Sequence, residues 1–213
     1  SKLKKTQIYL DTKLVLDVLG YSAAEHVAST NELVKLVRES GGTLNVFRHT
    51  VEELAGILTK YARDPLVRQS MTLDFFEEHC YEEIEVIRHR DTLNINLEKK
   101  GILITELPSH NASSEEDLSD RGFIDELKLK EHLESDYQKK GKSPTDQNIE
   151  RDVTSISAIS RLRGKESSSG IEDCKAIFVT QNLAIIRVVN DFFKDRFSKG
   201  EISFSISDID LTA

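Results

Sequence analysis

Two hydrophobic periods alternate along the amino-terminal third of the chain. Short apolar runs at Gln7–Leu10 and Thr43–Phe47 are typical of buried strands. A short apolar helix follows the first run and is ended by Gly20, and a second helix is expected from about Ala24 to Glu39. Strands alternating with helices are typical of βαβ units, so the pattern predicts an α/β protein with a parallel sheet.

A third helix is expected directly after the second strand. Thr50 is a candidate N-cap, and Glu53 stands three residues later, where the partner in a capping box belongs. The spacing of the apolar positions supports a helix with one buried face, formed by Val51, Leu54, Ala55 and Leu58.

The middle of the chain has a different pattern. One long helical stretch is expected from Pro65 to about Asp91, a short strand at Ile102–Thr105 and another helix from Phe123 to about Lys139. The segment Pro108–Asp120 is polar, acidic and without periodicity, which is typical of a loop. The apolar side of the long stretch would carry Phe75, Phe76, Cys80, Ile84 and Ile87.

The α/β pattern returns towards the carboxyl end. Helical spacing around Ile149 and Val153 precedes a compact apolar strand at Ala176–Thr180, and a further helix from Leu183 leads to a last strand at Ile202–Ile206. We therefore expect a single domain over residues 1–213, with a helical insertion at about 62–145. Because the chain ends soon after the last strand, we expect a longer natural protein with a further carboxyl-terminal domain.

Composition narrows the classes of protein. A hydrophobic fraction of 38% with 31% charged residues is enough to bury a core. The net charge of -8 excludes a uniformly basic protein that coats nucleic acid. Cys80 and Cys174 form neither a disulfide framework nor a zinc pattern, and both are expected in or near the core. With no apolar run long enough for a membrane and no signal peptide, a cytoplasmic location is expected.

Polar side chains stand at the points where the strands end. Asp11 follows the first strand, Glu53 lies one turn into the helix after the second, and Asn182 follows the Ala176–Thr180 strand. Asp152 lies near the start of a later helix. Because ligands of parallel sheets bind outside the carboxyl ends of the strands, these groups are expected to meet there. Clustered carboxylates repel unless a cation lies between them, and Mg²⁺ or Mn²⁺ prefers such oxygen ligands.

Four segments resemble the motifs of the PIN domain family: "IYLDTKLVLDVL", "HTVEELAGIL", "RDVTSISAISRL" and "AIFVTQN". The resemblance covers about residues 7–60 and 148–206. It implies a three-layer α/β/α fold with a mainly parallel sheet, and three or four acids that hold one or two Mg²⁺ or Mn²⁺ ions. It assigns the acids to Asp11, Glu53 and Asp152, with Asn182 in the place of the fourth, and Thr180 to the hydroxyl position.

Each of these residues also has a purely structural interpretation. Asp11 can cap a strand end, and Glu53 can serve only the capping box, with Glu52 as its rival for the ligand role. Asp152 can favour a helix start through the helix dipole, and Asn182 can be an N-cap. The candidates for contact with substrate are Thr12, Thr180, Arg161, Arg163 and Lys165.

The resemblance implies an endoribonuclease that cleaves single-stranded or loop regions of RNA with a metal-activated water. The alternative is a PIN-like scaffold that binds RNA or protein without cutting, because Asn182 replaces an acid. A receiver-type phosphate-binding domain is disfavoured, because no adjacent acidic pair follows the first strand. A homodimer is a further possibility that the sequence does not decide.

Overall fold

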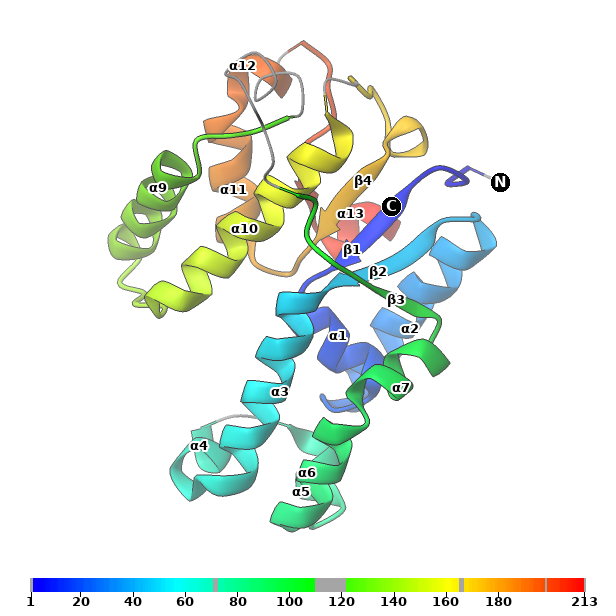
Figure 1. Ribbon diagram of the computed structural model, residues 1–213, viewed down its shortest axis with the longest axis vertical. Helices are drawn as coiled ribbons and strands as arrows, with labels where there is room; N and C mark the ends of the chain where they lie inside the picture. Colours follow the sequence, from blue (N-terminus) through cyan, green and yellow to red (C-terminus); the bar gives the residue numbers. More distant parts are fainter. Residues whose placement is uncertain (1, 71–72, 110–121, 165–166, 198, 213) are drawn as a thin grey trace.

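The computed structural model describes residues 2–70, 73–109, 122–164, 167–197 and 199–212. Over these residues, five strands form one parallel sheet in the order β3-β2-β1-β4-β5 (Figure 1). Ile8 at the centre pairs with Leu44 on one side and with Ile177 on the other. The strands are β1 Gln7–Leu10, β2 Thr43–Phe47, β3 Ile102–Thr105, β4 Ala176–Val179 and β5 Ser205–Ile206.

Helices cover both faces of the sheet because successive strand residues point to opposite sides. Ile8 and Leu10 belong to one buried cluster, whereas Tyr9 between them belongs to the other. The two clusters confirm the expected α/β fold with three layers (Figure 1). The first cluster includes residues of α1 Thr12–Leu19, α2 Ala24–Glu39, α3 Arg48–Arg63 and α7 Leu93–Lys99. The second includes residues of α9 Glu126–Lys139, α10 Asp146–Arg163 and α11 Leu183–Phe192.

The prediction of one long helix from Pro65 to about Asp91 is wrong. The chain forms three short helices, α4 Pro65–Ser70, α5 Asp74–Glu78 and α6 Glu83–Asp91. The reversal between α5 and α6 has its cause at Cys80, whose φ of 51° no helix accommodates. The backbone N–H of Glu82 then donates to Glu85 at 2.8 Å, which restarts a helix.

Two residues of that stretch were expected on its apolar side but lie at the surface. Cys80 is exposed, and the Ile84 side chain is 61% exposed. Phe76, by contrast, is buried against Tyr21 and Tyr61, so the aromatic residues rather than the helical period determine this packing. Cys174 is buried, as expected.

The expected capping box at Thr50 is also wrong. Helix α3 begins at Arg48, and its N-cap residue Phe47 makes no side-chain cap. Thr50 is buried in the first turn. The Glu53 carboxylate is thus not used for capping and is available elsewhere.

Several boundaries differ from expectation. Helix α9 begins at Glu126 rather than Phe123, because Asp125 accepts a hydrogen bond from the Lys128 N–H at 3.0 Å and caps it. Strand β5 is limited to Ser205–Ile206. Two short helices complete the carboxyl end, α12 Lys194–Phe197 and α13 Asp208–Thr212. Most of the expected loop, residues 110–120, lies outside the described residues.

Arg163 is a buried cation at the edge of the sheet where the strands begin. Its guanidinium donates to the carbonyls of Ala176, Ile202 and Ser203 at 2.6, 2.8 and 2.7 Å. It also lies over the Phe204 ring, 5.0 Å from the ring centre. One side chain thereby joins the end of α10 to β4 and to the segment that leads into β5.

We expect Arg163→Met to lower the free energy of unfolding by about 3 kcal/mol or more, because three buried carbonyls lose a charged donor. Urea denaturation measures the change. Arg88→Met, at an exposed position of α6, is the matched control and should change stability by less than about 0.5 kcal/mol. Equal stability of the two variants would contradict this role of Arg163 as a clamp, that is, as the donor of three hydrogen bonds to the carbonyls of Ala176, Ile202 and Ser203.

Candidate active-site cleft

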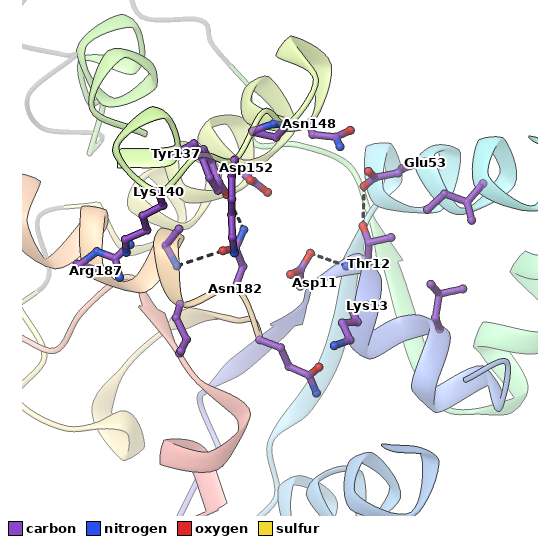
Figure 2. Close-up of a pocket in the computed structure, with 17 residues that line it drawn as sticks. Asp11, Thr12, Lys13, Glu53, Tyr137, Lys140, Asn148, Asp152, Asn182 and Arg187 are labelled. Carbon is purple, nitrogen blue, oxygen red and sulfur yellow. Dashed lines mark hydrogen bonds between the residues drawn. The ribbon is translucent and has the colours of Figure 1, made fainter. Parts of the chain in front are cut away.

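A cleft of about 730 Å³ opens at the carboxyl ends of the strands. The strand order reverses direction between β1 and β4, and such a switch point is where open parallel sheets bind ligands. All four residues expected at the site line this cleft (Figure 2). Asp11 and Asn182 are the N-cap residues of α1 and α11, and Glu53 and Asp152 lie within α3 and α10, so the packing of these four helices brings the residues together.

Asp11 is held between the two central strands. Its backbone N–H donates to the Val179 carbonyl at 3.0 Å. One carboxylate oxygen accepts from the Thr12 N–H at 2.6 Å, and the other accepts from the Thr180 hydroxyl at 2.5 Å. Burial raises the pKa of Asp11, and the two hydrogen bonds offset part of that rise. Asp11 is thus the N-cap of α1 as well as a cleft carboxylate.

Glu53 faces Asp11 from the first turns of α3. Its Oε2 accepts from the Thr12 hydroxyl at 2.6 Å, and its Oε1 lies 3.2 Å from Nη1 of Arg151. Both oxygens are therefore engaged, and the side chain is 18% exposed. Thr12, expected to contact substrate, instead connects the two acids by giving its N–H to Asp11 and its hydroxyl to Glu53.

Asp152 has no comparable support. Among the described residues, none donates a hydrogen bond to its carboxylate. Burial raises the pKa of Asp152 well above the usual range, and the negative charges of Asp11 and Glu53 raise it further. When ionised, the half-buried carboxylate of Asp152 is thus a negative charge to which no described residue donates a hydrogen bond, an arrangement that a bound cation would relieve.

The donor set consists of carboxylate, hydroxyl and amide oxygens, which fit a hard divalent cation. Within the described residues, however, no three His, Cys, Asp or Glu side chains stand as a group that could hold a metal ion. Glu53 is the reason we identify, since it points to Thr12 and Arg151. Asp11 and Asp152 would be the ligands, and Glu53 could join them only by exchanging one of its present bonds.

Asn182 acts as a helix cap. Its Oδ1 accepts from the Ala184 N–H at 3.1 Å, and its Nδ2 donates to the Tyr137 hydroxyl at 2.6 Å (Figure 2). The carbonyl oxygen expected to ligate metal is thus already in use. Tyr137 lies in the last turn of α9 and lines the cleft. Burial raises the pKa of Tyr137, and the nearby charges of Asp152 and Asp11 add to that rise.

Three expected substrate contacts are not supported by the geometry. Thr180 is fully buried, and its hydroxyl donates a hydrogen bond to Asp11. Arg161 and Arg163 are buried, and Arg163 lies about 16 Å along α10 from Asp152, at 1.5 Å per residue. Arg161 is bound instead to Ser157 at 2.9 Å and to Glu126. Lys165 lies outside the described residues.

The cations that do line the cleft were missed from the sequence: Lys13, Lys140, Lys142 and Arg187. Lys13 follows Asp11 by two residues, so its position was predictable. Lys140 and Lys142 lie just beyond α9, and only the packing of α9 against α10 and α11 brings them to the site. Arg187 is fixed by Asp136, with nitrogen–oxygen distances of 3.1 and 2.5 Å.

Comparison with known protein families, curated proteins and solved structures found no match to this chain. None of the described helices combines the length and apolarity that a membrane crossing needs.

His49 lies beside this site on α3. Its Nε2 is 2.9 Å from the Ser155 hydroxyl, while its Nδ1 is buried without a partner among the described atoms. Burial lowers the pKa of His49 to about 4, and the Arg151 charge contributes to the shift. The imidazole is therefore neutral at pH 7.

We expect His49 to make the protein less stable as the pH falls from 7 to 4. The unfolded chain binds a proton near pH 6.5 and the folded chain only near pH 4, so each proton taken up favours unfolding. The loss should approach about 3 kcal/mol at pH 4. The difference in unfolding free energy between wild type and His49→Gln, measured across that range, isolates this contribution. A difference independent of pH would show that His49 titrates normally.

We expect Asp152→Asn to stabilise the protein in EDTA by about 1–2 kcal/mol, because it removes a half-buried carboxylate that is repelled by Asp11 and Glu53. Thermal unfolding at pH 7 measures the change. The control is Asp173→Asn, an exposed acid before β4 at the opposite edge of the sheet, which should have no effect. Destabilisation by Asp152→Asn would mean that a protein group supports this carboxylate.

Proposed function

We propose that this chain is a PIN-like, divalent-metal-dependent nuclease that cleaves RNA. One observation carries the proposal: Asp152, half-buried and without a hydrogen-bond donor among the described residues, lines the same cleft as Asp11 at the switch point of the sheet. A carboxylate so placed costs stability, and such costs are typical of sites that bind a cation or perform chemistry.

Asp11 and Asp152 would hold the cation, with Glu53 as a further ligand after release from Arg151. When bound, a Mg²⁺ or Mn²⁺ ion supplies charge neutralisation at a phosphate and a water of lowered pKa. The protein fixes the orientation of the carboxylates that would hold the ion. Thr12 and Thr180 fix the oxygens of Asp11, and the pairing of β1 with β4 fixes the distance between their ends.

The rim of the cleft supports a phosphodiester substrate. Lys13, Lys140 and Lys142 line it together with Arg187, in a chain whose net charge is -8. Local positive charge beside a carboxylate site attracts a polyanion while the acids hold the metal. The preference for RNA, and for single-stranded or loop regions, is supported only by the resemblance of the four segments to PIN nucleases.

A scaffold that binds RNA or protein without cutting remains the second candidate. Two observations favour it: Asn182 brings no charge to the cleft, and Glu53 forms an ion pair with Arg151. In such a scaffold, Arg151 would permanently occupy the carboxylate that a metal needs.

We expect wild-type protein to cut a panel of end-labelled single-stranded and hairpin RNAs in Mn²⁺ or Mg²⁺, and not in EDTA. Asp11→Asn and Asp152→Asn should each reduce the rate by at least about a hundredfold, because each removes a ligand charge from the metal. Gel analysis of the labelled products measures the rates, and the same variants should lose the rise in melting temperature that Mn²⁺ gives wild type.

Asp173→Asn is the matched control and should cut like wild type. Binding of Mn²⁺ without cutting, seen by calorimetry, would leave a metal site but contradict the nuclease on these substrates. Neither binding nor cutting by wild type would favour the scaffold.

A further inference from the structure

Among the described residues, Tyr137 is the one aromatic side chain that lines the cleft. It comes from the last turn of α9, in the region between the resembling segments, and its side chain is 6% exposed. Helix α9 is fastened beside the site by the paired contacts between Asp136 and Arg187 on α11. The position of the phenol is therefore set by two packed helices rather than by a loop.

The orientation of the Asn182 amide is fixed. Because its Oδ1 accepts from the Ala184 N–H, its Nδ2 must be the group that faces Tyr137 at 2.6 Å. An amide nitrogen can only donate, so the phenol oxygen is the acceptor in this bond. The single proton of Tyr137 is consequently directed elsewhere.

No described residue accepts that proton. Asp152 and Asp11 lie near enough to act on the phenol electrostatically, and the phenol lines the cleft with them. A phenol is neutral at pH 7, so the hydroxyl of Tyr137 is a neutral hydrogen-bond donor that lies among carboxylates. A neutral donor can approach a phosphate oxygen without displacing a cation from the acids.

We propose that Tyr137, oriented by Asn182, donates a hydrogen bond to a non-bridging phosphate oxygen of the substrate. Asn182 then does not act as a weakened fourth acid, but sets the direction of a neutral phosphate donor. This inference rests on the proposed function for its substrate, although phosphate binding itself can be measured without cleavage.

The test measures binding of orthophosphate by calorimetry in Mg²⁺, together with Mn²⁺ affinity and RNA cleavage, in wild type and Tyr137→Phe. We expect phosphate affinity to fall about tenfold in the variant, since a hydrogen bond to a charged group is lost. Mn²⁺ affinity should stay within about twofold. Tyr81→Phe, in the link between α5 and α6, is the matched control and should leave all three quantities unchanged.

A second variant separates this role from that of a missing acid. Asn182→Asp can still cap α11, but its carboxylate would accept the phenol proton and turn it away from substrate. We expect it to cut more slowly than wild type. Faster cutting would show that position 182 serves as a metal ligand and would overturn the proposal.

The two proposals fail in different ways. Equal phosphate affinity of wild type and Tyr137→Phe, or no phosphate binding by wild type, overturns the role of Tyr137 even if RNA is cut. Loss of phosphate affinity in Tyr137→Phe without cutting by any protein supports that role and contradicts the nuclease.

Discussion

The hydrogen bond from Thr180 to Asp11 joins the ends of the two central strands, and the geometry of the cleft depends on it. Strand β1 ends at Leu10 and β4 at Val179, and their parallel register brings the next residue of each chain segment together. Thr180 is fully buried, so this contact is a fixed part of the core rather than a surface bond. Every other group of the site is arranged around a carboxylate that cannot turn.

The three acids of the cleft differ in how many hydrogen-bond donors and cations the protein places beside them. Asp11 receives two donors and Glu53 receives a hydroxyl and a guanidinium, whereas Asp152 receives none from the described residues. Asp152, which is half-buried, is therefore the acid of the cleft that the protein compensates least. This uneven support of the three acids is the feature on which the proposed cation site rests.

The sequence predicted the parts of this arrangement that depend on local pattern. Strands β1, β2 and β3 and the positions of Asp11 and Glu53 follow from short apolar runs and what stands after them. The predictions from sequence failed where contacts between distant parts of the chain determine the position of a residue. Thr50 looks like an N-cap, but the N-cap of α3 is Phe47, the last residue of β2, three residues earlier. Arg161 and Arg163 look like exposed basic residues, but their guanidinium groups are needed inside the fold.

The cations of the cleft show the same limit. Lys140, Lys142 and Tyr137 lie in a stretch without a motif, and only the packing of α9 brings them to the site. Their roles depend on tertiary contacts between elements about 45 residues apart, as in the contact of Tyr137 with Asn182. No period or spacing within a single segment records such a pairing.

Helix α10 begins at Asp146, before the position expected from the sequence, and it carries Asp152 in its second turn and Arg163 as its last residue. Arg163 thus anchors the helix at the end away from the cleft, while Lys130 pairs with Asp146 and Glu150 at the other end. Over evolutionary time, residues around the cleft can be exchanged for new specificity while the clamp keeps the helix in place. A fold built in this way can change what it binds without first changing what holds it together.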